Sequence, residues 1–179
     1  MRIISGQFKS RRITAPKKLP VRPTTDMAKE SLFNILNNEY YFDDISVLDL
    51  FAGTGNISYE FASRGTQEIT AVDENHGCIK FINETAKDLD MSITTIKSDV
   101  FKYLERAKQE FTVIFADPPY NFSVEDFSKI PELIFQNKFL QEEGLLIVEH
   151  SKHTDISHLK NYSHSKGYGG NCFSFFKFT

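Results

Sequence analysis

The sequence predicts an α/β protein built on a mostly parallel sheet with helices on both faces. From residue 45 onward, short apolar runs alternate with segments of helical periodicity. This alternation is typical of a parallel sheet, because two parallel strands need a crossover connection between them. The tail carries two further runs joined by Tyr168-Gly-Gly, without a helix between them, and this predicts a terminal antiparallel hairpin.

The expected elements follow one another regularly. Strands are expected at 45–50, 68–73, 93–97, 111–116 and 145–149, and the hairpin, at 161–164 and 172–178, brings the sheet to seven strands. Helices are expected at 57–64, 75–89, 100–108 and 124–137, the last interrupted near Pro131.

The residues before this region predict an arm, a connector and one more helix. Residues 2–13 alternate weakly around a Ser-Gly turn, which indicates a small β-hairpin. Three prolines between residues 16 and 23 favour an extended connector. Helical spacing of apolar residues then predicts a helix from the Thr-Thr-Asp cap at 24–26 to about Asn38. We therefore divide the chain into a basic arm with its connector, 1–24, and a single domain, 25–179.

Composition places the chain among ordinary globular proteins. It has 179 residues, of which 40% are apolar and 25% charged. No apolar run reaches the roughly 20 residues of a membrane span, and the start of the chain lacks a signal-peptide pattern, so we expect a cytoplasmic protein. The two cysteines and five histidines follow no ligand spacing, and we expect no metal.

Charge is distributed unevenly along the chain. The net charge of −3 divides into +7 on residues 1–22, which contain no acid, and −10 on the remainder. A basic arm of this kind is suited to contact phosphate groups, although a merely solvated terminus fits the charge equally well. Its basic residues are Arg2, Lys9, Arg11, Arg12, Lys17, Lys18 and Arg22.

A glycine turn follows the first expected strand of the sheet. In Asp49-Leu-Phe-Ala-Gly53-Thr-Gly55, the glycines allow the backbone to approach a ligand and lead into a helix N-terminus. Asp73, twenty positions after Gly53, stands where an acid accepts ribose hydroxyls in nucleoside-binding sheets. Ser58 takes the position of the third glycine of a dinucleotide fingerprint, which argues against an NAD enzyme.

The third and fourth strands also end in polar residues. Asp99 could accept from an adenine amino group with Phe101 against the ring, or it could simply cap the next helix. Asp117-Pro-Pro-Tyr120 combines acceptor oxygens, a rigid turn and an aromatic face, which suits a planar base with an exocyclic amino group. All these features are expected at one edge of one sheet, where ligands bind in such folds.

Taken together, these motifs resemble those of class I S-adenosylmethionine-dependent methyltransferases that act on exocyclic amino groups. With Arg22-Pro-Thr24 and the Lys29–Asn34 segment, the chain is most similar to the RsmD-type family, which methylates N2 of a guanine in bacterial 16S rRNA. The resemblance implies a Rossmann-like fold, S-adenosyl-L-methionine as cofactor, and 16S rRNA in a small ribosomal subunit as partner of a monomer.

The resemblance also implies roles for individual residues. The cofactor pocket would be formed by Arg22, Thr24, Asp49, Phe51, Gly53, Gly55, Asp73, Asp99 and Val100. Asp117, Pro118 and Tyr120 would hold the guanine, and the basic residues of the arm other than Arg22 would bind RNA. The C-terminal hairpin receives no function.

Other functions remain open at this point. A DNA or RNA adenine-N6 methyltransferase can carry the same Asp-Pro-Pro-Tyr motif, although the DNA enzymes usually have an additional target-recognition domain. A protein glutamine methyltransferase would be expected to have Asn in place of Asp117. A non-catalytic RNA-binding assembly factor is the alternative outside the enzymes, and the intact acidic and glycine positions argue against it.

Overall fold

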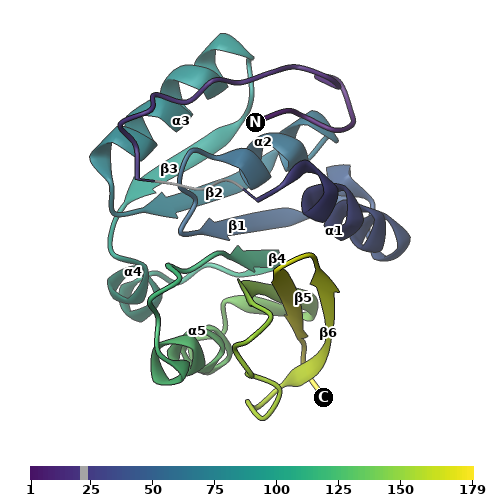
Figure 1. The fold of residues 1–179 in the computed structure, drawn as a ribbon, viewed down its shortest axis with the longest axis vertical. Coiled ribbons are helices and arrows are strands. Elements are labelled where there is room, and N and C mark those ends of the chain that lie inside the picture. Colours follow the sequence, from purple (N-terminus) through teal and green to yellow (C-terminus); the bar gives the residue numbers. More distant parts are fainter. Residues whose placement is uncertain (21–23) are drawn as a thin grey trace.

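The computed structural model, which describes residues 1–20 and 24–179, is built on a seven-stranded sheet (Figure 1). The strands are β1 Ser46–Leu50, β2 Glu68–Asp73, β3 Ile93–Lys97, β4 Phe111–Ala116, β5 Leu140–Ser151, β6 Tyr162–Tyr168 and β7 Asn171–Phe176. They lie in the order β3-β2-β1-β4-β5-β7-β6. β1 to β5 pair in parallel, and β7 runs antiparallel to its neighbours β5 and β6. The predicted sheet and terminal hairpin are confirmed.

Helices cover both faces of the sheet. They are α1 Asp26–Glu39, α2 Asn56–Ser63, α3 His76–Asp88, α4 Val100–Arg106 and α5 Val124–Gln136, with a short 3-10 helix at Phe42–Asp44. Apolar residues of α4 and α5 pack in one core with one face of β1 and β4, whereas α1 and α2 pack in another core on the opposite face. Figure 1 shows α4 and α5 across the sheet from α1, α2 and α3. Both faces of β1 are therefore buried, as expected for a central strand of a parallel sheet.

Two predicted details are wrong. The helix α5 passes through Pro131 without interruption, and Phe127, Ile130 and Ile134 hold it in the core on both sides of the proline. Strand β5 begins at Leu140, five residues before the predicted start. The first part of β5 is polar and exposed at Gln141–Glu143, and the register of its pairing with β4 shifts there. These residues therefore lack the apolar pattern from which a strand is predicted.

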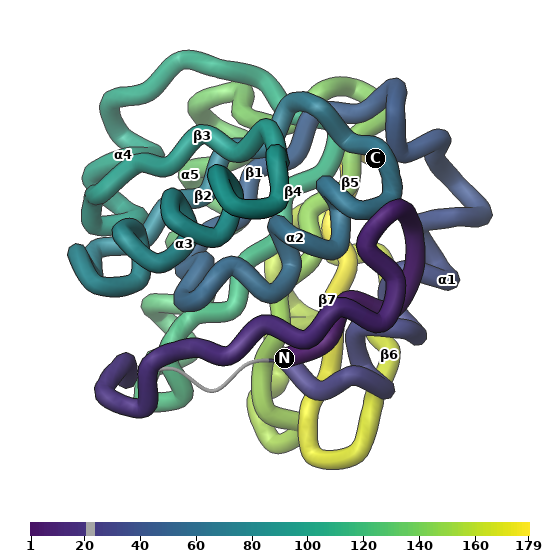
Figure 2. The backbone as a smooth tube through the Cα atoms, turned by 90° about the horizontal axis from the view of Figure 1, so that it is seen from above, coloured from purple at the N-terminus to yellow at the C-terminus, as the bar shows by residue number. Residues whose placement is uncertain are grey.

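The N-terminal arm lies across α2 and reaches the start of α3, and Figure 2 shows it running along this side of the molecule. The predicted hairpin is present in a short form: Ile3 N–H donates to the Arg11 carbonyl and Ile13 N–H to the Met1 carbonyl, and Arg2 forms an antiparallel bridge with Arg12. The pairing does not extend to Ile4 and Ser5, whose backbone N–H groups donate to the Glu60 carboxylate. No helix among the described residues is long and apolar enough to cross a membrane.

Candidate active site

The carboxyl ends of the parallel strands open into a cavity of about 670 Å³. Most of the predicted site residues line it: Thr24, Asp49, Phe51, Gly53, Asp73, Asp99, Val100, Asp117, Pro118 and Tyr120. Gly55 is not among the lining residues, and the predicted Arg22 lies outside the described residues. The topology therefore brings side chains from four strand ends and the connector to one place, as expected for a doubly wound sheet.

The glycine turn after β1 is held by bonds to the end of β2. Gly53 has φ +55° and its N–H donates to Asp73 Oδ2 at 2.8 Å, while Ala52 N–H donates to the Val72 carbonyl. Gly55 has φ +83°, and a Cβ there would lie 2.8 Å from the ring of Tyr59. Gly55 thus serves the turn into α2, because a larger residue would be strained and would clash.

Asp49 is buried at the end of β1 with a carboxylate facing α2. Its Oδ2 accepts from Ser58 Oγ at 2.6 Å and from Ser58 N–H at 3.2 Å, so the serine at the third-glycine position has a structural use. Burial raises the pKa of Asp49 to about 7, against the lowering effect of the two Ser58 hydrogen bonds. Within residues 1–20 and 24–179, its Oδ1 accepts no hydrogen bond and remains available to a ligand in the cavity.

Asp73 connects two loops of the site. Its Oδ2 accepts from Gly53 N–H and its Oδ1 from Asn75 N–H, each at 2.8 Å. Burial raises the pKa of Asp73, and these two backbone bonds oppose the rise. Each carboxylate oxygen can accept a second hydrogen bond, so this geometry leaves the predicted contact with hydroxyl groups possible.

Asp99 caps α4 and also borders an aromatic part of the cavity. Its Oδ1 accepts from Lys102 N–H at 2.9 Å, so the helix-cap reading of this residue is correct. Phe101 and Phe122 stack at 6.0 Å between ring centroids, and Phe51 meets both edge-on. All three rings line the cavity, which gives this end a flat apolar lining.

The Asp-Pro-Pro-Tyr turn follows β4 and leads directly to Phe122 of this lining. Within the described ranges, the Asp117 carboxyl accepts no hydrogen bond, and the Tyr120 ring is 60% exposed. The pKa of Asp117 is raised well above its usual value by burial first, and then by the charges of Glu149 and Asp49. In its ionised form, a carboxyl that accepts no hydrogen bond from the described residues and stands beside an exposed ring can bind a donor group on a planar molecule.

The basic residues of the arm are exposed on its outer surface. Arg2 Nε forms a half-exposed ion pair with Asp26 Oδ2 at 3.1 Å, so its charge is partly neutralised. The remaining predicted RNA contacts, Lys9, Arg11, Arg12, Lys17 and Lys18, are all solvent-exposed.

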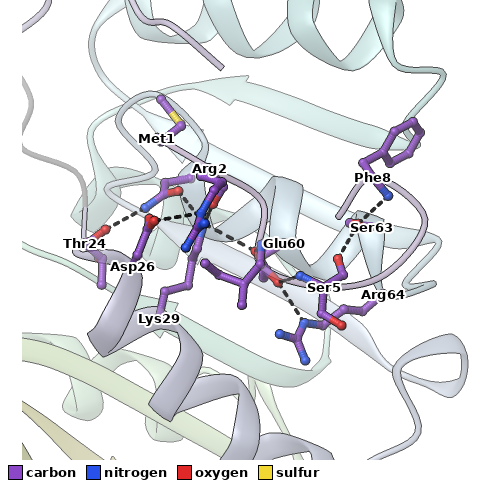
Figure 3. Close-up of polar contacts among 12 residues, drawn as sticks. Met1, Arg2, Ser5, Phe8, Thr24, Asp26, Lys29, Glu60, Ser63 and Arg64 are labelled. Atoms are coloured by element: carbon purple, nitrogen blue, oxygen red, sulfur yellow. Dashed lines mark hydrogen bonds and ion pairs between the residues drawn. The ribbon is translucent and has the colours of Figure 1, made fainter. Parts of the chain in front are cut away.

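A buried charge network fixes the arm to the domain (Figure 3). Glu60 accepts from Ile4 N–H, Ser5 N–H and Arg64 Nε at 2.9–3.0 Å. Lys29 Nζ lies 3.3 Å from Glu60 Oε2 and donates to the Arg2 carbonyl at 2.6 Å. Lys29 and Glu60 are fully buried, so each charge depends on these partners.

This network reaches the cavity through Asn56. Lys29 Nζ donates to Asn56 Oδ1 at 2.9 Å, and Asn56 Nδ2 donates to the Thr24 carbonyl at 3.0 Å. Asn56 and Thr24 both line the cavity. The arm, the connector and the start of α2 are therefore held in one arrangement.

Five residues of the cavity and its hydrogen-bond network were not predicted as site residues: Asn56, Lys29, Glu60, Phe122 and Glu149. A signal existed for Lys29, which occupies an inward position of α1 between Ala28 and Leu32, where a lysine is unusual. Glu60 likewise lies among buried residues of α2. The other three follow from tertiary contacts alone.

Comparison with known proteins agrees with this geometry. The model of the family described as conserved hypothetical protein 95 matches residues 1–177. A Bacillus subtilis protein named "Putative rRNA methyltransferase YlbH" is 35% identical over 161 residues, which cover 87% of this chain and 85% of that protein. "Ribosomal RNA small subunit methyltransferase D" of Escherichia coli K12 is 28% identical over 150 residues, covering 83% and 74%.

Solved structures show the same fold. The Escherichia coli structure described as "Putative methyltransferase yhhF" superposes with a TM-score of 0.87 at 23% identity, over 100% of this chain and 99% of that chain. The family resemblance read from the motifs is confirmed. The chain belongs to the conserved hypothetical protein 95 family, the family of the RsmD-type methyltransferases.

Proposed function

We propose that this protein transfers a methyl group from S-adenosyl-L-methionine to the exocyclic N2 amine of a guanine in 16S rRNA. The observation that carries the proposal is the Asp117 carboxyl, which accepts no hydrogen bond from residues 1–20 and 24–179, beside the exposed Tyr120 ring in a cavity that Asp49 and Asp73 also line. The names of the relatives support a ribosomal RNA substrate.

The residues of the cavity fit the cofactor. Its volume of about 670 Å³ is within the usual range for sites that bind small molecules. Asp49 Oδ1 is suited to an amino group, Asp73 to ribose hydroxyls, and the rings near Asp99 to adenine. When bound, the cofactor supplies a methyl group whose bond to sulfur breaks as the bond to guanine N2 forms.

The chain's own contribution is to orient the amine and stabilise its charge. The lone pair of an exocyclic amine is delocalised into the ring, so the nitrogen is a weak nucleophile. Asp117 Oδ and the Pro118 carbonyl accept its two N–H bonds, which directs the lone pair toward the methyl group. The carboxylate also stabilises the positive charge that develops on nitrogen, and Tyr120 stacks on the base. The proton leaves after transfer, so no strong base is needed.

The arm supplies the contacts with RNA. Its exposed cations follow a segment that the Glu60 network fixes to α2, so they are presented at a defined place relative to the cavity. The same proposal includes the small ribosomal subunit as the context of the substrate, a monomeric enzyme and a cytoplasmic location.

Labelled-methyl transfer to 16S rRNA, small subunits and DNA, followed by nucleoside analysis, tests the proposal. We expect N2-methylguanosine from an RNA-containing substrate, and Asp117→Ala should lower kcat by at least about a hundredfold while the Kd for the cofactor changes little. Asp126→Ala, which alters an exposed acid in the cap of α5, is the control. N6-methyladenine in DNA, or full activity of Asp117→Ala, would refute the assignment.

A further inference from the structure

Glu149 is a buried carboxylate at the end of β5 that joins three distant parts of the chain. Its side chain is 3% exposed. Its Oε2 accepts from Thr24 Oγ1 of the connector, and its Oε1 accepts from Asn171 Nδ2 at the start of β7, both at 2.7 Å. The three residues are far apart in sequence, so this contact exists only in the folded chain.

Glu149 stands directly beside Asp117. Strands β4 and β5 are parallel with Ala116 opposite Val148. Asp117 directly follows Ala116 at the end of β4, and Glu149 is the next residue of β5. The two carboxyls nevertheless differ in their contacts. Both oxygens of Glu149 are occupied by protein donors, whereas the Asp117 carboxyl accepts no bond from the described part of the chain. Glu149 is therefore bound to other parts of the protein, whereas Asp117 is open to the cavity.

The contact with Thr24 continues into the network that holds the arm. The Thr24 carbonyl accepts from Asn56 Nδ2, and Asn56 Oδ1 accepts from Lys29 Nζ. Figure 3 shows Thr24 at one end of this network and the arm residues Ser5 and Phe8 toward the other. At its far side, Asn171 borders the exposed Gly169-Gly170 turn between β6 and β7. Glu149 thus links the arm and connector to the terminal hairpin.

We propose that Glu149 is a positioning residue for methyl transfer, which fixes the connector and the β6–β7 turn on the Asp117 side of the cavity, where the target base enters. The reaction named here rests on the proposed function. An uncharged side chain could also accept a hydrogen bond from Thr24. That bond alone therefore does not explain why position 149 has a carboxylate. Among residues 1–20 and 24–179, the charged groups that act on Asp117 are Glu149 on β5 and Asp49 on β1, both carboxylates. Burial raises the pKa of Glu149, and its hydrogen bonds from Thr24 and Asn171 oppose the rise and favour the ionised form. Beside this charge, the ionised form of Asp117 is a stronger acceptor for the amine N–H groups.

Two substitutions separate these effects. Glu149→Gln keeps an oxygen for Thr24 but removes the charge, whereas Glu149→Ala removes both. Ser174→Ala is the matched control, because it deletes a buried hydrogen bond of the same hairpin, to His150 Nε2, away from the cavity. Glu149→Gln also covers the case in which Glu149→Ala fails to fold.

In the cofactor-free protein, we expect carboxyl NMR to give a lower pKa for Asp117 in Glu149→Gln than in the wild type. Hydrogen exchange of segments 24–28 and 168–172 should be faster in Glu149→Ala. In the assay, Glu149→Ala should lower kcat about a hundredfold with the cofactor Kd within about threefold. Glu149→Gln should recover most of the activity, with the acidic limb of its kcat–pH profile displaced to lower pH.

An unchanged Asp117 pKa in Glu149→Gln, together with losses of kcat no larger than that of Ser174→Ala, would overturn the proposal and leave Glu149 a structural residue. Absence of rRNA methylation by the wild type would instead refute the proposed function. The NMR and exchange measurements do not depend on activity, so the two failures are distinguishable.

Discussion

The affinity for S-adenosylmethionine should strengthen as the pH rises from about 5.5 to about 8, because Asp49 must lose a proton to accept a hydrogen bond from the ligand's amino group. The free protein holds this carboxyl protonated at low pH, since burial raises its pKa to about 7 from the usual 3.8. The second oxygen, Oδ1, faces no protein donor among the described residues, so the ligand can compensate the buried charge.

The size of the effect follows from the pKa. At pH 6 only about one Asp49 in eleven is ionised, so the Kd should be about tenfold higher than at pH 8, and binding should release about 0.9 proton. The same shift affects stability. A carboxyl with a raised pKa in the folded state stabilises the fold below its unfolded pKa, and this contribution is lost as the pH rises through the folded pKa. The free energy of unfolding without cofactor should therefore fall by about 3 kcal/mol between about pH 4 and pH 7.

Calorimetry in two buffers of different ionisation enthalpy measures both the Kd and the proton release. Asp49→Asn should bind the cofactor weakly and with little dependence on pH. Asp117→Asn, which alters the base side of the cavity, should keep the wild-type dependence of Kd. A Kd that is flat across this pH range in the wild type, or an equal proton release in Asp49→Asn, would refute the role given to this carboxylate.

Three further predictions concern the arm and its attachment. Arg11→Gln with Arg12→Gln should weaken RNA binding and reduce the slope of log K against log salt by about one to two, whereas an unchanged slope would exclude these cations from the interface. Gly6→Ala should release the arm from α2, because the new Cβ would lie 1.8 Å from the Ser63 carbonyl oxygen and the backbone there has φ +85°. Limited proteolysis should then cut within residues 1–13, and an arm that stays protected would contradict this prediction. Lys29→Met should lower the free energy of unfolding by about 3 kcal/mol in chemical denaturation, because Glu60 loses a buried cationic partner. A loss below about 1 kcal/mol would show that Arg64 is sufficient to balance the charge of Glu60.

The strands and the acids at their ends could be predicted because both leave local patterns. A strand buried on both faces is rich in apolar residues, and an acid that ends such a run, as Asp73 ends β2, stands out in the sequence. The attachment of the arm leaves no such pattern. Glu60 accepts hydrogen bonds from backbone N–H groups of residues 55 and 56 positions earlier in the chain. Because these donors belong to the backbone, the sequence does not indicate which side chain they will contact. Glu149 is the last residue of the fifth strand that the sequence predicts, but its contacts depend on Thr24 and Asn171, which only the fold brings to it.

These contacts also change how RNA recognition by an acidic protein can be tested. The cations lie on an arm that is anchored at Ile4 and Ser5 by Glu60, so they are held in place rather than carried on a free tail. Ile3 of the arm is itself buried in a core cluster with Tyr59. Deleting residues 2–12 would expose that core and remove two donors from the buried Glu60, so the loss of binding would report on the fold as much as on charge. Substitutions of exposed cations leave the anchor intact. Only these substitutions can distinguish the proposed attraction between the arm and RNA phosphates from the contribution of the arm to the structure of the site.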